Sequence, residues 1–275
     1  MAAKRPREEQ IRAFFRTLYT AWGRQHWWPA QTRFEVIVGA YLTQNTAWSN
    51  VERALANLRQ ARVLKLAGIR NLPLAELEKL IRSAGYFRQK ARRLKTFVRF
   101  LDTRYGGSLS RMFAQPTAEL RAQLLELNGV GPETADSILL YAGSHPVFVV
   151  DAYTRRILDR HRILRLKADY EDARALFERA LREPGFMREQ SGMVLETGSP
   201  KPETPAGSCH PPSPASTMQR TPLAQVYNEM HGLIVGVGKN YCRASEVRCE
   251  ECPLGPLLSA RPTVKKKPLR ARGKR

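Results

Sequence analysis

The chain has 275 residues and is strongly basic, with 46 Lys and Arg against 25 Asp and Glu, a formal net charge of +21 and a pI near 10.4. The last fifteen residues carry eight basic side chains and no acid, so the excess belongs to the rest of the chain as well. This charge predicts a polyanionic partner, because phosphate contacts release condensed counterions. The sequence shows no run of 18 apolar residues and no signal-peptide pattern, so we expect a cytoplasmic, nucleoid-associated protein without a membrane span.

The elements from residue 8 to about 183 have a helical pattern with almost no strand alternation, which predicts an all-α fold. Residues 34–42, FEVIVGAYL, could form a buried strand by periodicity alone, but the following TQNTAWSNVERALANL favours two helices that meet at a polar turn. Residues 74–84 predict a short helix that stops at Gly85. Residues 90–105 predict a longer one, because apolar residues recur there at helical spacing.

Residues 184–222 interrupt this pattern. They contain eight of the chain's 18 prolines, among Ser, Gly and Thr, and too few hydrophobic residues to offset the entropy of ordering. We therefore expect a disordered insert, with the fold made of residues 1–183 and 223–258. The basic segment 259–275 is expected to be a disordered tail.

Residues 117–142 predict a helix-hairpin-helix. The first helix presents an apolar face of Leu120, Leu124 and Leu127. Gly129 and Gly131 then permit close approach of another molecule to the backbone, while Val130 between them can anchor the turn in the core. Pro132 begins the second helix, whose free N–H groups and positive dipole end suit a phosphate.

This stretch resembles the helix-hairpin-helix plus Gly/Pro-rich-Asp (HhH-GPD) motif of the endonuclease III superfamily of DNA glycosylases. The similarity extends to FEVIVGAYLTQNT and GYFRQKARRL, and so covers most of residues 30–165. The resemblance implies a two-lobed helical fold with a DNA-binding cleft between the lobes. It also implies that Gly129, Val130 and Gly131 bind the phosphates of double-stranded DNA.

Two further positions acquire roles from the resemblance. Asp151 in VVDAYTRR matches the aspartate that serves the N-glycosidic bond, and Gln44 matches the glutamine that fills the space of the extruded base. The residue pattern alone leaves simpler roles open. An aspartate before AYTRRIL is a good helix N-cap, and a glutamine after FEVIVGAYLT can close a helix turn.

Glu133 limits the expected chemistry. Members of the family that also cut the strand have a lysine here, eighteen residues before the catalytic aspartate, and its amine forms a Schiff base with the sugar. A carboxylate cannot form that bond, so we expect a monofunctional glycosylase in which Asp151 activates water or stabilises the oxocarbenium-like sugar. Without the resemblance, Glu133 is also a first-turn acid that the helix dipole favours.

The phrases LTQNTAW and GPETADSILLYA resemble the endonuclease III-type 3-methyladenine glycosylases, which implies an alkylated purine in double-stranded DNA as the substrate. The aromatic residues that could stack on such a base, or simply fill the core, are Trp27, Trp28, Trp48 and Tyr86. Removal of mismatched thymine or uracil, or of adenine, is an alternative. A non-catalytic DNA-damage-binding protein is another, and charge alone also allows a membrane-surface protein. We expect a monomer.

The cysteine loop, residues 242–252, has the spacing C-x6-C-x2-C through Cys242, Cys249 and Cys252. It resembles the loop that holds a [4Fe–4S] cluster in this superfamily, but Leu258 stands where the fourth cysteine belongs. Three alternatives remain open: Cys209 supplies the fourth ligand from elsewhere in the chain, the cluster has a fourth ligand that is not a cysteine, or the loop holds no metal. Zinc is a further alternative, with His210 or Cys209 as fourth ligand.

Basic residues around this loop suggest a second contact with DNA phosphate. These residues are Lys239, Arg243 and Arg248. The tail KKKPLRARGKR is expected to add affinity that is independent of sequence and sensitive to salt, although both groups could equally be solvated surface.

Overall fold

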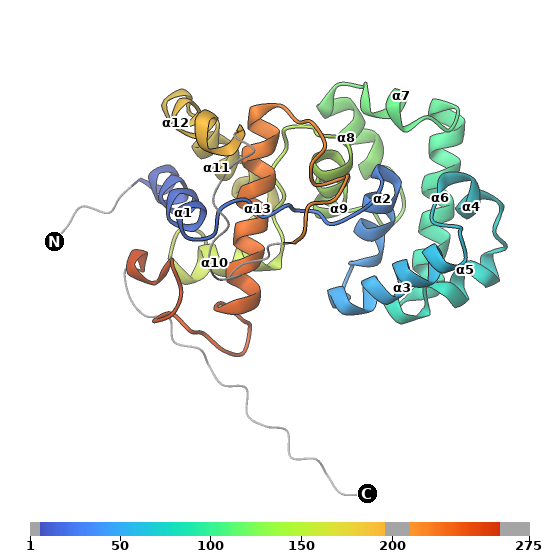
Figure 1. The fold of residues 1–275 in the computed structure, drawn as a ribbon, viewed down its shortest axis with the longest axis horizontal. Coiled ribbons are helices and arrows are strands. Elements are labelled where there is room, and N and C mark those ends of the chain that lie inside the picture. Colours follow the sequence, from blue (N-terminus) through green and yellow to red (C-terminus); the bar gives the residue numbers. More distant parts are fainter. Residues whose placement is uncertain (1–5, 196–209, 259–275) are drawn as a thin grey trace, which may run out of the picture. The chain divides into compact units, whose positions relative to one another are not determined.

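The computed structural model describes residues 6–195 and 210–258 (Figure 1). Within these ranges the chain forms helices and one isolated bridge between Cys242 and Val247, and no strand. The predicted all-α class is therefore confirmed. The chain divides into two compact units, one of residues 1–25, 150–209 and 229–275 and the other of residues 26–149 and 210–228.

The unit of residues 26–149 and 210–228 carries the hairpin. Its helices are α2 (Arg33–Leu42), α3 (Trp48–Gln60), α4 (Leu66–Asn71), α5 (Leu74–Leu80), α6 (Phe87–Tyr105), α7 (Leu109–Phe113), α8 (Thr117–Leu125) and α9 (Pro132–Ser137), with short helical turns η1 (Arg82–Ala84) and η2 (Ile138–Ala142). Thr32 caps α2 by accepting a hydrogen bond from the Glu35 amide. Residues 34–42 are all buried, so this helix shows no polar face in its sequence. That burial explains why periodicity alone could not separate helix from strand here.

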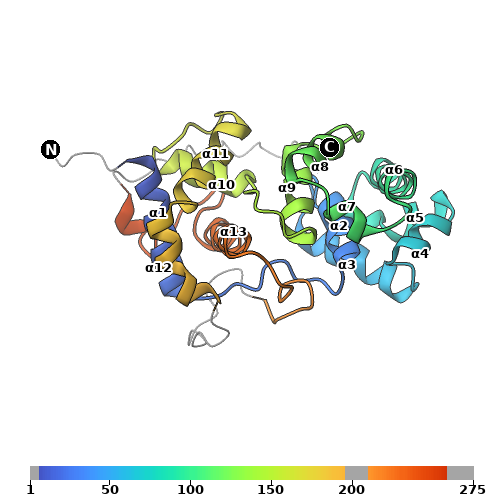
Figure 2. The same cartoon turned by 90° about the horizontal axis from the view of Figure 1, so that it is seen from above.

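The other unit contains α1 (Arg7–Trp22), α10 (Ala152–Arg160), α11 (Tyr170–Leu181), α12 (Pro184–Leu195) and the short turn η3 (Gly255–Leu257). Helix α13 (Pro222–Asn240) contributes residues from 229 onward to this unit. The apolar face of α1 packs against α11, and both views show α1 beside α11 and α12 (Figures 1 and 2).

The prediction that residues 184–222 form a disordered insert is wrong for the parts that the structure describes. Residues 184–195 form α12, whose first turn is capped by the Glu183 carboxylate through the amides of Gly185 and Phe186. Phe186 is buried against Phe15 of α1, with ring centroids 5.4 Å apart. The proline at the helix start was compatible with a helix, because its missing N–H has no partner in a first turn.

Residues 210–221 are also ordered, although they contain no regular helix. The Ala30 amide donates to Ser213 Oγ, and the Ala215 amide donates to the Ala30 carbonyl oxygen. This pair of bonds fixes a serine-rich turn against a segment about 180 residues earlier in the chain. Residues 196–209 and the basic tail 259–275 lie outside the described residues.

Candidate active site

The helix-hairpin-helix predicted at residues 117–142 is present as α8, a tight turn, and α9 continued by η2. Gly129 has φ +79°, in the left-handed region that favours glycine, and Val130 between the glycines is buried. Gly131 differs, because its φ is −94° and no atom of the described residues lies within 4 Å of a Cβ added there. The first glycine is thus required by the turn itself, and the second leaves open space beside the start of α9.

Gln44 lies in the turn after α2 and is hydrogen-bonded to the hairpin. Its Nε2 donates to the carbonyl oxygen of Gly129 and to Oγ1 of Thr134, both at 2.9 Å. Its Oε1 accepts from Nη1 of Arg93 at 2.7 Å, and the Arg93 side chain also covers Gly129. The amide of Gln44 therefore links the hairpin to α6. The role suggested by the resemblance, filling the space of an extruded base, stays a prediction.

Glu133 lies in the first turn of α9, where its side chain is exposed. Its backbone carbonyl accepts a hydrogen bond from Ser137 Oγ at 2.7 Å. An acid in this turn interacts favourably with the positive end of the helix dipole. The position that the resemblance assigns to a catalytic lysine is thus occupied by a solvent-facing carboxylate.

Asp151 is the N-cap of α10, as the sequence pattern allowed. Its Oδ1 accepts from the backbone amide of Thr154 at 2.7 Å and from the Thr154 hydroxyl at 2.8 Å. The second oxygen, Oδ2, lies 3.8 Å from Nε2 of the buried His231 on α13. Burial lowers the pKa of His231, and the Asp151 charge opposes that shift. The helix start therefore fixes one carboxylate oxygen while the other faces a histidine that the sequence analysis did not identify.

Lys90 on α6 is a second residue that the sequence analysis did not assign. It is buried, and its Nζ donates to the carbonyl oxygens of Leu42 and Ala84 and to Oγ1 of Thr46, at 2.6–2.8 Å. Burial lowers its pKa to about 8. Because three acceptors occupy the ammonium group, Lys90 joins α2, η1 and α6 and does not present a free amine.

The four aromatic candidates differ in burial, and Trp48 is intermediate. Trp27 and Trp28 are buried, and Trp28 contacts Trp48 and Tyr141 at centroid distances of 5.2 and 5.3 Å. Trp28 Nε1 is buried without a hydrogen-bond partner, although a buried indole usually has one. Tyr86, by contrast, is 67% exposed. Trp27, Trp28, Trp48 and Tyr141 therefore form one largely buried aromatic cluster.

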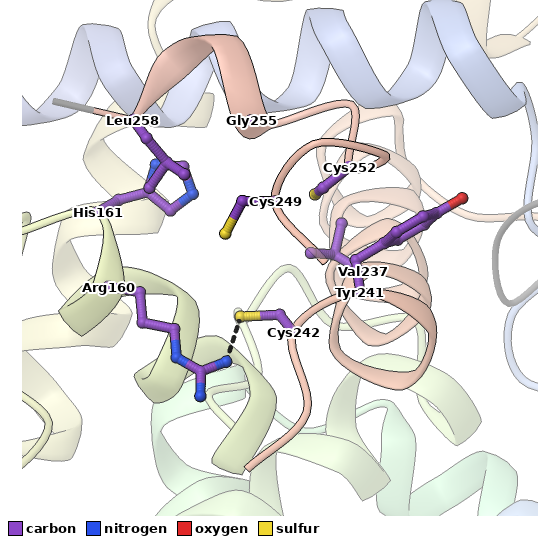
Figure 3. A pocket seen from close by; sticks show the side chains of 9 residues that line it. All are labelled: Arg160, His161, Val237, Tyr241, Cys242, Cys249, Cys252, Gly255 and Leu258. Atoms are coloured by element: carbon purple, nitrogen blue, oxygen red, sulfur yellow. Dashed lines mark hydrogen bonds between the residues drawn. The ribbon is translucent and has the colours of Figure 1, made fainter. Parts of the chain in front are cut away.

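The three cysteines of the loop, Cys242, Cys249 and Cys252, line one pocket after α13 (Figure 3). Nη1 of Arg160 donates to Sγ of Cys242 at 3.0 Å. A Cβ on Gly255 would lie 2.1 Å from the Cys249 carbonyl oxygen, so the loop can close only with glycine there. Burial raises the pKa of the Cys252 thiol to about 11, and the other two cysteines contribute to that shift.

Leu258, at the position of the missing fourth cysteine, lines the same pocket, and so does His161 from the end of α10. His161 is 7% exposed, and its buried Nδ1 has no hydrogen-bond partner within residues 6–195 and 210–258. The sequence suggested two other fourth ligands. Cys209 lies outside the described residues, and His210 belongs to the other unit, where its ring lies 5.7 Å from that of Trp27. In the described ranges no three His, Cys, Asp or Glu side chains converge on a single metal ion, as zinc would require.

The basic residues around the loop contact residues that are close to them in the sequence. Nε of the exposed Arg243 donates to the carbonyl oxygen of Lys239 at 2.9 Å, while Arg248 pairs with Glu246 at the same distance. Contact of Lys239 and Arg243 with DNA stays a prediction. No helix in the described part of the chain is long and apolar enough to cross a membrane.

Comparisons with known proteins agree with this geometry. Residues 38–183 match the HhH-GPD superfamily base excision DNA repair protein family. A protein of Methanocaldococcus jannaschii named as a DNA repair glycosylase is 38% identical over 90% of this chain and 94% of its own length. Endonuclease III of Bacillus subtilis is 25% identical over 80% of this chain and 78% of its own length.

Among solved structures, the 3-methyladenine DNA glycosylase MagIII of H. pylori, bound to 1,N6-ethenoadenine, has a TM-score of 0.65 and 27% identity. The match covers 86% of this chain and 98% of that one. The chain therefore belongs to the HhH-GPD superfamily of base excision repair proteins and is a DNA N-glycosylase. The resemblance proposed from the hairpin and the aspartate is confirmed.

Proposed function

We propose that this enzyme is a monofunctional glycosylase, which hydrolyses the bond between base and sugar and leaves the strand intact. The observation that carries the proposal is Glu133, an exposed carboxylate at the position where strand-cutting relatives have a lysine. The buried Lys90 does not replace that lysine, because its ammonium group is held by three acceptors. Without an amine that attacks C1′, no Schiff base forms, and the elimination that would cut the strand cannot follow.

The proposed reaction uses water as the nucleophile and Asp151 as the catalytic carboxylate. The C1′–N bond breaks, the base leaves with the electron pair, and a water oxygen bonds to C1′ as the water proton passes to a carboxylate oxygen or to solvent. Hydrogen bonds from Thr154 hold Asp151 Oδ1, so Oδ2 is the oxygen available to stabilise positive charge on the sugar or to accept the proton. His231 lies beside Oδ2 and limits its orientation.

We propose an N-alkylated purine as the damaged base. Two observations support this choice: the similarity to a 3-methyladenine glycosylase, and the cluster of Trp27, Trp28 and Trp48. An alkylated purine carries positive charge and a weakened glycosidic bond, so aromatic faces and a modest carboxylate suffice to bind and release it. Hairpin contacts through Gly129 and Gly131 and loop contacts through Lys239 and Arg243 would hold the duplex.

We also propose that the cysteine loop holds an iron–sulfur cluster through Cys242, Cys249 and Cys252. The residues fit such a group, because three thiols line one pocket and a buried, unpartnered imidazole nitrogen lines it too. When bound, the cluster would supply one-electron redox chemistry and a rigid core for the loop. Hydrolysis of the bond between the damaged base and the sugar uses Asp151 and water and requires no electron transfer.

The test is a panel of duplexes that carry alkylated purines, mismatched thymine, uracil or adenine, scored for abasic sites after hot alkali. We expect base release from the alkylated purine, no strand breaks before alkali, and no borohydride-trapped complex. Preferential release of another base would refute the substrate, and an efficient enzymatic trap would refute monofunctional chemistry. DNA binding without base release from any duplex would indicate a damage-binding protein.

A further inference from the structure

The sequence of the cysteine loop supplies only three of the four ligands that an iron–sulfur cluster usually has. The structure places a candidate for the fourth ligand beside the loop. Three cysteines come from the loop, and Leu258, which cannot bind metal, occupies the fourth position of the family spacing. His161 precedes the loop by 81 residues and comes from α10, yet it lines the same pocket as Cys249 and Leu258. In Figure 3 the imidazole and the Leu258 side chain overlap in projection, and both line the pocket that Cys249 also lines.

The surroundings of His161 match those of a metal-binding histidine. Its ring packs edge-on against Phe14, with centroids 4.7 Å apart, so the imidazole is oriented by the core. The Leu257 backbone lies near enough to the ring to oppose the lowering of the His161 pKa by burial, and Nδ1 has no hydrogen-bond partner among the described residues. A histidine that binds metal through one nitrogen usually donates the other N–H to a carbonyl, which fixes the ring. A buried nitrogen without a partner otherwise costs free energy that a ligand would recover.

Charge around the pocket is consistent with a cluster that carries thiolates. The Arg160 guanidinium contacts Cys242 Sγ, and Arg156 Nε donates to the Cys242 carbonyl oxygen at 2.6 Å. Two arginines of α10 thus contact Cys242, and Arg160 also lines the pocket. Each ligand of a [4Fe–4S] cluster binds a different iron, so its ligands line a cavity and do not converge on one point. That arrangement agrees with side chains that surround a pocket without meeting at a single ion.

We propose that His161 is the fourth protein ligand of a [4Fe–4S] cluster held by Cys242, Cys249 and Cys252. This inference rests on the proposed cofactor and is independent of the glycosylase reaction. Replacement of a thiolate by a neutral imidazole makes the ligand set less negative by one charge. The cluster is therefore expected to have a higher reduction potential than its four-cysteine counterpart, as histidine ligation has in Rieske centres.

The experiment compares the full-length wild type with the variants His161→Ala, His161→Cys and His161→Ala/Leu258→Cys, purified without oxygen. Iron content, visible absorbance and pulsed electron paramagnetic resonance of the reduced protein are measured. Wild type should hold about four irons per chain and show a nitrogen nucleus coupled to the cluster. H161A should lose at least about one of these four irons per chain, since that iron lacks a protein ligand. H161C should keep the iron, lose the nitrogen coupling and have a lower reduction potential.

The double variant and a distant histidine provide the controls. H161A/L258C restores the four-cysteine spacing, so its iron content should return toward the wild-type value without nitrogen coupling. His145→Ala removes another buried histidine, in the other unit, and should change neither iron content nor coupling. An iron-loaded wild type without nitrogen coupling would overturn the role of His161 and leave the cluster intact. An iron-free wild type, even after reconstitution with iron and sulfide, would overturn the cluster and His161 together, and base release would then be judged separately.

Discussion

Replacement of the two hairpin glycines, Gly129 and Gly131, by alanine should affect different properties of the protein. They are two residues apart in one turn, and both are expected to approach DNA phosphate. Gly129 has φ +79°, and a Cβ there would lie 2.0 Å from Nε of Arg93. Gly131 has an ordinary φ of −94° and open space around its Cβ position. Gly129→Ala therefore perturbs the fold, whereas Gly131→Ala perturbs only what approaches from outside.

The expected magnitudes follow from these conformations. A side chain in the left-handed region costs about 1–2 kcal/mol, and displacement of Arg93 from Gln44 Oε1 removes a hydrogen bond of about 1 kcal/mol. G129A should therefore lower the free energy of unfolding by about 2–3 kcal/mol. In G131A, the smaller entropy of the unfolded chain offsets the loss of a preferred N-cap residue. Its free energy of unfolding should change by less than about 0.5 kcal/mol.

The assay pairs urea denaturation with fluorescence anisotropy on a duplex that contains an abasic-site analogue. G131A should unfold as the wild type does but bind the duplex at least about tenfold more weakly, a loss of about 1.4 kcal/mol, because its methyl group occupies the space for a phosphate. G129A should be impaired in both measurements. Wild-type affinity in a stably folded G131A would refute the argument that this glycine permits close approach of DNA.

Three further substitutions test the catalytic and structural assignments. Glu133→Lys should create a borohydride-trapped complex with abasic DNA, since it restores an amine at the lysine position. The control Glu133→Gln should form no such complex. Equal trapping by the two variants would exclude a Schiff base at residue 133. Asp151→Asn should reduce base release by about 10²–10⁴-fold. It should preserve thermal stability, because asparagine also caps helices. Activity near the wild-type value would show that Asp151 is not the catalytic carboxylate. Lys90→Met should destabilise the fold by about 2–4 kcal/mol by leaving buried acceptors unpaired. Burial lowers the pKa of Lys90 to about 8 from 10.5. Between these pH values the unfolded wild type binds more protons than the folded one, so wild-type stability should rise with pH relative to K90M, and a parallel pH dependence would contradict the shift.

The sequence by itself determined the features that depend on a few consecutive residues. The helical class, the hairpin at 117–142 and the N-cap role of Asp151 follow from local backbone preference and side-chain spacing, and the structure shows all three. Glu133 at the lysine position is likewise visible without coordinates. Such features can be predicted because the groups that interact are close along the chain, so their geometry changes little with the rest of the fold.

Only the tertiary structure decided the contacts between distant segments. Gln44 binds a hairpin 85 residues away, and His161 lines the pocket of a loop that begins at Cys242. Composition predicted disorder from residue 184, yet burial of Phe186 against α1 accompanies a helix there. Each of these outcomes depends on which side chains from separate segments share a buried space. That is a property of packing, and neither periodicity nor composition along the chain contains it.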